Sequence, residues 1–244
     1  MTPLKPSDTS AKSVKEYAIL FDMDGVLVDV TDSYRKAIQE TTQFFTGKTV
    51  EPSEIQAFKE KGGLNNDWDL TEAILLSRGK TVPKAGIIKK FQELYLGSDE
   101  KKGFIENEKW LLQKEKLVAL HKQHKLGIVT GRPRAETLYV LKKFHMQNLF
   151  DVIVAMEDYP PEKTKPDPYP IKLAMEKLGL EDAVYVGDSV DDITAAKRAG
   201  VKAIGCIPSG VPLSHLGDLL LKNGAKEVLS NINDVDKILA KERF

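Results

Sequence analysis

Short apolar runs alternate with helical patterns through the second half of the chain, and this alternation constrains the fold more than any other feature. The runs cover residues 126–129, 152–155, 183–186 and 203–207, and the helical patterns cover residues 134–144, 168–178 and 189–199. Strands that alternate with helices in this way build βαβ units, in which neighbouring strands are parallel. The sequence therefore predicts an α/β fold with a Rossmann-like parallel sheet at its core.

One further apolar run, residues 17–21, leads directly into two acidic residues and a glycine. Asp22 follows the run, Asp24 lies two residues later, and Gly25 permits a sharp turn. Side chains two residues apart in extended chain point to the same side, and open α/β sheets bind ligands at the carboxyl ends of their strands. The two carboxylates could therefore converge on one reacting group. A capping Asp followed by an Asp-Gly turn is the simpler alternative.

A long helical stretch separates this first run from the alternating half. Apolar residues recur at helical spacing in residues 34–45, 55–58, 70–75, 87–95 and 110–121, with Asp32 as the expected cap of the first helix, and no strand pattern stands out between residues 30 and 125. A loop within a βα unit usually has only about 2–6 residues. We therefore predict an inserted α-helical cap domain over residues 31–113. Residues 15–30 and 114–244 would form the core, and residues 1–14 a disordered tail.

Charge and composition exclude several classes of partner. The chain has 36 basic and 36 acidic residues, so no overall field attracts nucleic acid or an anionic membrane. Cys206 is the single cysteine, which excludes an intramolecular disulfide. No apolar stretch reaches the roughly 20 residues of a membrane span, and the N-terminal residues lack a signal-peptide core. We expect no nucleic-acid or membrane partner and a cytoplasmic location, or an organellar stroma or matrix after removal of a transit peptide.

Polar residues suited to phosphoryl transfer follow three of the predicted strands or lie in the loop before the third: Asp22, Asp24, Thr130, Gly131, Lys165, Asp188 and Asp192. They include a nucleophile, a proton donor, phosphate-binding donors, a cation and carboxylates for a magnesium ion. Taken singly, Thr130 with Gly131 also fits an ordinary turn, and Lys165 a solvated loop cation. Asp191 and Asp192 also fit acidic residues at the start of a helix, and we favour that role for Asp191.

Four segments carry a resemblance to a known family. DMDGV, IVTGR, KPDP and GDSVDD, in this order, resemble the four motifs of the haloacid dehalogenase superfamily. Their spacing is similar to that of the subfamily with a helical cap after the first strand. That subfamily contains phosphoglycolate phosphatases, β-phosphoglucomutase and many sugar-phosphate phosphatases. The resemblance covers residues 17–210.

The resemblance implies a role for each matching residue. Asp22 would be the nucleophile that forms an aspartyl-phosphate. Asp24 would protonate the leaving alcohol and then activate water. Thr130 and the Gly131 amide would bind phosphate oxygens, and Lys165 would neutralise charge between the phosphate and Asp22.

The resemblance also implies a bound Mg²⁺. Its ligands would be the Asp22 carboxylate, the main-chain carbonyl of Asp24 and the carboxylate of Asp188, with Asp192 orienting the metal's waters. Mg²⁺ favours few carboxylates and several waters, which agrees with this set.

The expected function is Mg²⁺-dependent hydrolysis of a small phosphorylated metabolite, such as phosphoglycolate or a sugar phosphate. Asp24 argues against dehalogenation, because a leaving halide needs no proton. A phosphosugar mutase is an alternative, but β-phosphoglucomutases carry a histidine in the linker into the cap, and residues 29–36 have none. A non-catalytic regulatory or binding protein on the same fold is an alternative of another class.

Substrate specificity would come mainly from the cap, since a core that binds only phosphate treats all phosphomonoesters alike. The loop of residues 61–68 combines a flexible turn with a cation, two amides and an aromatic ring. We expect Lys61, Asn65, Asn66 and Trp68 to contact the substrate, and a plain loop with a helix cap is the alternative. We also expect mobility near residues 30–31 and 103–106, where the cap would hinge.

Overall fold

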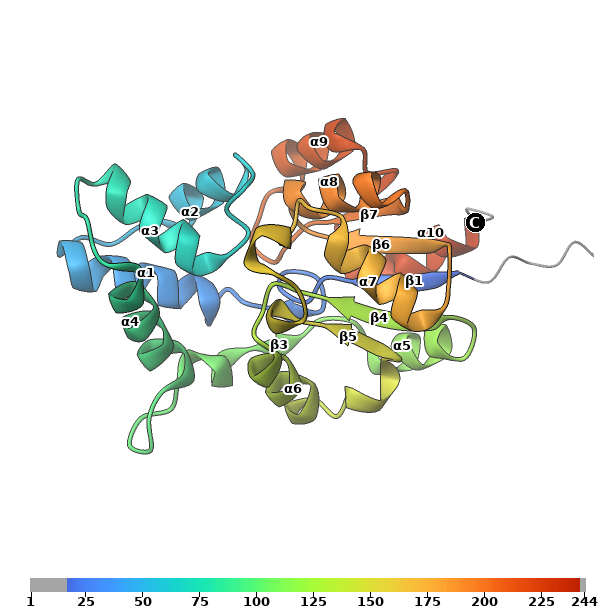
Figure 1. Cartoon of the computed structure of the whole chain (residues 1–244), viewed down its shortest axis with the longest axis horizontal. Coiled ribbons are helices and arrows are strands. Elements are labelled where there is room, and N and C mark those ends of the chain that lie inside the picture. The colour runs from blue at the N-terminus through green and yellow to red at the C-terminus, as the bar shows by residue number, and fades with distance from the viewer. Residues whose placement is uncertain (1–16, 242–244) are drawn as a thin grey trace, which may run out of the picture.

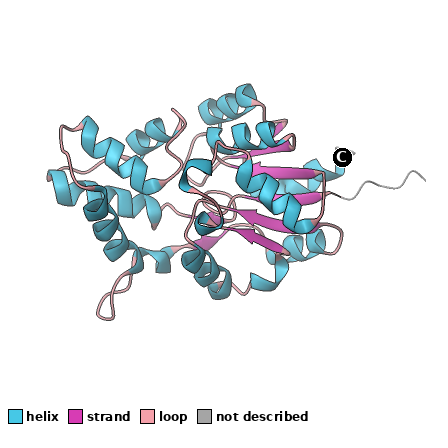
Figure 2. Cartoon of the chain, in the orientation of Figure 1, coloured by secondary structure: helices cyan, strands magenta, loops and turns pink. Residues whose placement is uncertain are grey.

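The computed structural model describes residues 17–241, so the predicted tail at residues 1–14 lies outside the described residues. Within residues 17–241, six parallel strands form one sheet in the order β5-β4-β1-β6-β7-β8 (Figures 1 and 2). The strands are β1 (Ala18–Phe21), β4 (Lys125–Val129), β5 (Val152–Val154), β6 (Ala183–Gly187), β7 (Lys202–Cys206) and β8 (Glu227–Leu229). The predicted α/β fold with a Rossmann-like parallel sheet is confirmed.

Helices cover both faces of this sheet. Ile19 and Phe21 of β1 pack with α5 (Lys114–His121), α6 (Arg134–Lys143) and α10 (Val235–Lys241). Ala18 and Leu20, on the opposite face, pack with α7 (Tyr169–Leu178), α8 (Val190–Ala199) and α9 (Leu213–Asn223). Because both faces are buried, the central strands are apolar throughout and show no alternation with polar residues.

Strand β1 lies between β4 and β6, and this strand order determines where the candidate site lies. Phe21 pairs with Ile128 on one side and with Val186 on the other. The residues that follow these three positions therefore leave the sheet side by side. Loops that are far apart in the chain meet at this edge, as expected for ligand sites in open α/β sheets.

The remaining helices lie beyond the carboxyl edge of the sheet, on the left in Figure 1. They are α1 (Tyr34–Thr46), α2 (Pro52–Lys59), α3 (Asp67–Ser77) and α4 (Lys84–Leu96), followed by a 3₁₀ turn, Phe104–Asn107. Helix α1 packs against both α3 and α4. In the part of the chain that is described, no helix is long and apolar enough to cross a membrane.

A two-stranded antiparallel ladder marks where the chain leaves the six-stranded sheet and its covering helices, named the sheet domain, and where it returns. Strand β2 (Val28–Asp29) pairs with β3 (Lys109–Trp110). The expectation of no strand between residues 30 and 125 was therefore wrong, because a two-residue strand is too short to show a period. The predicted helix at residues 110–121 begins only at Lys114, since Trp110 belongs to β3.

The predicted cap of the first helix was also wrong. Ser33, not Asp32, occupies the N-cap position of α1, and it makes no side-chain capping bond. The Ser33 hydroxyl instead donates a hydrogen bond of 3.0 Å to Oε1 of Glu108, in the segment that returns from the inserted helices. A contact between residues 75 positions apart overrides a local capping preference, and only the fold shows it.

Candidate active site

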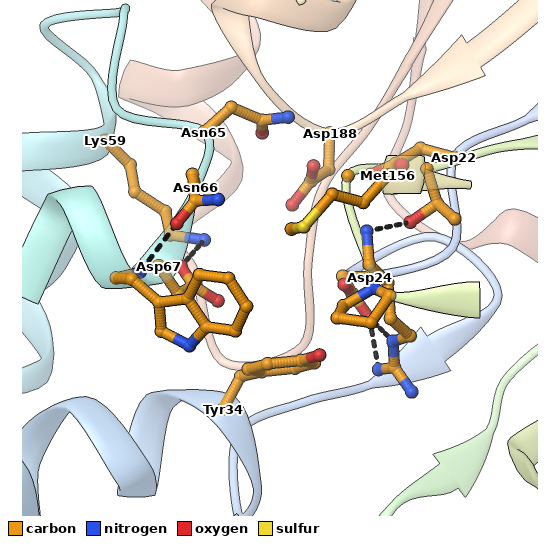
Figure 3. A pocket seen from close by; sticks show the side chains of 14 residues that line it. Asp22, Asp24, Tyr34, Lys59, Asn65, Asn66, Asp67, Met156 and Asp188 are labelled. Atoms are coloured by element: carbon orange, nitrogen blue, oxygen red, sulfur yellow. Dashed lines mark hydrogen bonds and ion pairs between the residues drawn. The ribbon is translucent and has the colours of Figure 1, made fainter. Parts of the chain in front are cut away.

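A cavity opens where the carboxyl ends of β1, β4 and β6 face the inserted helices (Figure 3). The sheet domain contributes Asp22, Asp24, Thr130, Gly131, Arg132, Pro133, Met156 and Asp188 to its lining. The inserted helices and their connections contribute Tyr34, Lys59, Asn65, Asn66, Asp67 and Trp68. The fold thus brings five of the predicted core site residues to one cavity, opposite three of the four predicted specificity residues.

Lys165 lies beneath this cavity and does not line it. Its ammonium nitrogen is 2.9 Å from Oδ1 of Asp22 and 2.6 Å from Oδ1 of Asp192, and its side chain is fully buried. The hydroxyl of Tyr185 lies at 3.0 Å and the carbonyl oxygen of Val129 at 3.4 Å. A buried ammonium requires such partners, because an unpaired charge in the interior costs several kcal/mol.

The Asp22 carboxylate has one oxygen occupied by Lys165. Among the described residues, no hydrogen bond reaches its Oδ2. Burial raises the pKa of Asp22 to about 7, Lys165 opposes this rise, and the neighbouring carboxylates of Asp192 and Asp24 add to it. Asp22 therefore has a free oxygen at the cavity and an excess of negative charge around it.

Three carboxylates form a cluster that could hold a metal ion. Ligand oxygens of Asp22, Asp188 and Asp192 lie within 4.8 Å of one another. Burial, followed by repulsion from Asp192 and Asp22, raises the pKa of Asp188 well above its usual value. These carboxylates raise one another's pKa, and a divalent cation with oxygen ligands would offset their mutual repulsion.

Asp192 differs from the other two carboxylates because both of its oxygens are already occupied. Oδ1 accepts from Lys165 and Tyr185, and Oδ2 accepts from the main chain and hydroxyl of Ser189. Although burial opposes it, Lys165 lowers the pKa of Asp192, as do the hydrogen bonds from Ser189 and Tyr185. Asp192 is therefore suited to a supporting position behind Asp22 and Asp188.

Gly25 makes the approach of Asp188 possible. Its φ of 77° is in the left-handed region, and a Cβ at this position would lie 2.3 Å from Oδ2 of Asp188. The Asp-x-Asp-Gly pattern thus requires a glycine for its backbone conformation, and also because a side chain there would collide with Asp188.

Thr130 and Gly131 line the cavity at the end of β4. The Thr130 hydroxyl oxygen accepts a hydrogen bond of 3.1 Å from the main-chain nitrogen of Arg132, which leaves its hydrogen free to donate. The Thr130 carbonyl accepts from the Tyr159 hydroxyl at 3.1 Å. The loop therefore presents a hydroxyl donor in a position fixed by its neighbours.

The loop between α2 and α3, together with the helix ends on either side of it, supplies most of the opposite wall. Asn66 caps α3, because its side-chain oxygen accepts from the main chain of Trp68 at 2.9 Å. Asn65 approaches the sheet domain, and its side-chain nitrogen lies 3.8 Å from the Cβ position at Gly131. Lys61 does not line the cavity. It is exposed, and its ammonium lies over the ring of Phe58.

Lys59 is the cation that this wall presents, and the sequence reasoning missed it. Its ammonium forms an ion pair of 3.0 Å with Asp67, inside the cavity lining (Figure 3). Lys59 ends α2 and lies shortly before the loop that contains Gly62 and Gly63. A lysine on the cavity face at the end of α2 could be recognised only after the position of the helix was known.

A contact between Gly63 and Asp191 joins the same loop to the sheet domain. The main-chain nitrogen of Gly63 donates to both carboxylate oxygens of Asp191, at 3.0 and 2.9 Å. Burial raises the pKa of Asp191, although this hydrogen bond opposes the shift. The sequence favoured Asp191 as an acidic residue at the start of a helix, and Asp191 does lie in the first turn of α8. Its carboxylate also binds the loop between α2 and α3.

The chain is similar to proteins of known sequence and to solved structures. A protein of Phytophthora nicotianae named imidazoleglycerol-phosphate dehydratase is 39% identical over 198 residues, which are 78% of this chain but only 43% of that longer relative. A phosphoglycolate phosphatase of Nitrosospira multiformis is 30% identical over 197 residues, covering 79% of this chain and 83% of the relative. A solved structure from Thermotoga maritima, provisionally assigned as a beta-phosphoglucomutase, is 25% identical, with a TM-score of 0.66 and coverage of 92% and 99%.

The family model for haloacid dehalogenase-like hydrolases matches residues 19–206, which include all four motifs and the inserted helices. The predicted resemblance to this superfamily is confirmed. The chain is a member of the haloacid dehalogenase-like hydrolase family.

Proposed function

We propose that this chain is a Mg²⁺-dependent phosphomonoester hydrolase that acts through an aspartyl-phosphate on Asp22. The observation that supports it best is the convergence of Asp22, Asp24, Thr130 and Asp188 on one cavity, with the Lys165 ammonium 2.9 Å from Asp22. A structural role alone does not require these side chains to share a cavity. The Nitrosospira multiformis relative is named as a phosphatase, which agrees with the proposal.

In the first half of the proposed reaction, the Asp22 carboxylate attacks the phosphorus of the ester. Lys165 holds Oδ1 of Asp22, so that Oδ2 is the attacking atom. The Thr130 hydroxyl and the Gly131 amide bind the phosphate oxygens, where they offset developing negative charge. Asp24 gives its proton to the leaving alcohol oxygen. The P–O bond to the alcohol breaks as the bond to Asp22 forms.

In the second half, Asp24 acts as a base. It takes a proton from a water molecule that attacks phosphorus, and Asp22 leaves as a free carboxylate. Splitting one displacement into two steps lets the same residue serve first as acid and then as base.

The carboxylates of Asp22 and Asp188 and the main-chain carbonyl of Asp24 would hold the Mg²⁺, and Asp192 would support them. When bound, the ion neutralises charge on the transferring phosphate and on the clustered carboxylates. The cluster of Asp22, Asp188 and Asp192, whose ligand oxygens lie within 4.8 Å of one another, supports this assignment.

We further propose that the inserted helices form a cap that contacts the alcohol part of the substrate. Asn65, Asn66 and Trp68 line the cavity opposite Asp22, and Lys59 takes the place expected for Lys61. Amides, an aromatic ring and an ion pair suit a small polar phosphate ester, such as a sugar phosphate or phosphoglycolate.

The test is hydrolysis of p-nitrophenyl phosphate and of a panel of alkyl phosphates, with and without Mg²⁺. Wild-type protein should turn over substrate only with the ion, and Asp22→Asn should abolish turnover. Unchanged turnover in Asp22→Asn would overturn the mechanism. Formation of glucose 6-phosphate from β-glucose 1-phosphate would instead favour a mutase, and an intact protein inactive on every ester would favour the non-catalytic alternative.

A further inference from the structure

The guanidinium of Arg132 lies between two carboxylates, one in the candidate active site and one at the junction with the inserted helices. Its Nε is 3.0 Å from Oδ1 of Asp24, and Nη2 contacts the same oxygen. On its other side, Nη1 and Nη2 bind the two oxygens of Glu108 at 2.9 and 3.0 Å. The side chains of Arg132 and Glu108 have no exposed surface. The guanidinium is therefore fixed in one orientation by four contacts.

Glu108 is held in turn by hydroxyl groups at the start and near the end of the inserted helices. Its Oε1 accepts from the hydroxyl of Ser33, at the start of α1, and from that of Tyr95, near the end of α4, at 3.0 and 2.9 Å. Tyr34, beside Ser33, stacks on Tyr95 at 4.2 Å and lies against the Arg132 guanidinium at 4.8 Å. The position of Arg132 thus depends on how the inserted helices sit on the sheet domain.

Both contacts to Asp24 end on Oδ1. Among the residues that the structure describes, none donates a hydrogen bond to Oδ2 of Asp24. Asp24 lines the cavity, and a quarter of its side chain is exposed there. In Figure 3 dashed lines join its carboxylate to the guanidinium. One oxygen is therefore anchored while the other remains available to a substrate oxygen.

We infer that Arg132 is a positioning residue for Asp24, and that Glu108 holds Arg132 in place and links it to the inserted helices. The inference rests on the proposed function, in which Asp24 protonates the leaving group. A planar guanidinium with two donors toward each carboxylate fixes direction as well as distance, which an ammonium cannot do. Proper orientation of a general acid matters only when the leaving group requires a proton.

Leaving-group dependence separates this role from a purely structural one. An alkoxide needs protonation as it leaves, whereas p-nitrophenolate leaves without it. Arg132→Lys should lower kcat/KM for the best alkyl ester of the panel by about 100-fold, the usual scale of general-acid catalysis. It should lower kcat/KM for p-nitrophenyl phosphate by less than about fivefold. Glu108→Gln should act in the same direction with a smaller effect.

The matched controls are Arg134→Lys and Glu106→Gln. Arg134 pairs with Asp158, and Glu106 lies near Lys143, so neither contacts Asp24. Both variants should keep the wild-type ratio of alkyl to aryl turnover. If Arg132→Lys does not fold, Tyr95→Phe removes one hydrogen bond to Glu108 and preserves both charges. Tyr95→Phe should lower the ratio of alkyl to aryl ester turnover by a few fold.

A double-mutant cycle gives the sharpest readout. In an Asp24→Asn background, Arg132→Lys should cause no further loss of alkyl ester turnover. Equal losses on alkyl and aryl esters, or an additive loss in the Asp24→Asn background, would overturn the inference and leave the phosphatase proposal intact. A wild-type enzyme that hydrolyses only the aryl ester would also overturn the inference and leave the phosphatase proposal intact. A wild-type protein inactive on both esters would instead refute the proposed function.

Discussion

The ammonium nitrogen of Lys165 lies 2.9 Å from Oδ1 of Asp22, and the lysine side chain is fully buried. The same nitrogen lies 2.6 Å from Asp192, so one cation compensates two buried carboxylates. This contact joins the loop before α7 to the end of β1, 143 residues away in sequence. It links the stability of the sheet domain to the geometry of the candidate nucleophile.

Replacement of Lys165 should destabilise the protein strongly. Lys165→Met leaves Asp22 and Asp192 without their cation, and breaking a buried pair in this way costs about 3–5 kcal/mol of unfolding free energy. Lys163→Met is the control, because Lys163 is exposed and lies 3.5 Å from Asp167. It should change the free energy by less than about 1 kcal/mol. Urea unfolding measures both, and similar values for the two variants would contradict the assigned contact.

The stability of metal-free protein should depend on pH through Asp22. Burial raises the pKa of Asp22 to about 7, so the folded state keeps a proton that the unfolded chain has lost. The free energy of unfolding should therefore fall as pH rises from about 4 to about 7. Asp22→Asn removes this contribution. In chelator, wild-type protein should lose more stability between pH 5 and pH 8 than Asp22→Asn, and parallel curves would contradict the prediction.

Gly25→Ala should abolish turnover while the protein still folds. An added Cβ would lie 2.3 Å from Oδ2 of Asp188, so that carboxylate must move away from the metal cluster. We expect a loss of at least about 100-fold in kcat, with weaker binding of Mg²⁺. Gly179→Ala is a matched control. Its φ is also positive, at 67°, but no atom lies within 4 Å of the added Cβ. Gly179→Ala should cost about 1–2 kcal/mol of stability and leave kcat unchanged.

The bond between Gly63 and Asp191 should hold the α2–α3 loop on the sheet domain. Asp191→Ala removes the acceptor, so amide hydrogens of residues 62–65 should exchange faster with solvent deuterium. Asp191→Asn keeps one acceptor oxygen and should exchange at nearly the wild-type rate. Hydrogen exchange with mass spectrometry checks this. Identical protection in Asp191→Ala and wild-type protein would show that other contacts hold the loop.

The sheet, and the position of the candidate site at its carboxyl edge, could be predicted because short stretches of sequence indicate them. Each strand that carries a motif is a short apolar run, and Asp22, Thr130 and Asp188 follow these runs directly. Parallel pairing then brings their carboxyl ends together without further information. The chain after residue 207 was predicted only as part of the core, without individual elements, and β8, α9 and α10 complete the sheet domain there.

The residues that sequence analysis missed act through distant contacts. Arg132 directly follows Thr130 and Gly131, yet its importance comes from Glu108 and Asp24, on either side of it in the fold. Lys61 was predicted to contact the substrate and Lys59 was not, although both lysines lie near the same glycine turn. The direction of α2 decides between them: Lys59 points into the cavity, and Lys61 lies over Phe58. Helical spacing shows the face of a helix, but not which face meets the site.

The most direct test of the account is to identify the residue that becomes phosphorylated. Asp24→Asn should slow attack by water more than attack by Asp22 when the leaving group is p-nitrophenolate, so the intermediate should accumulate. Acid quenching within the first turnover, followed by peptide mass spectrometry, locates the phosphoryl group. We predict phosphate on Asp22. Turnover without any phosphorylated peptide, or phosphate on a different residue, would contradict it.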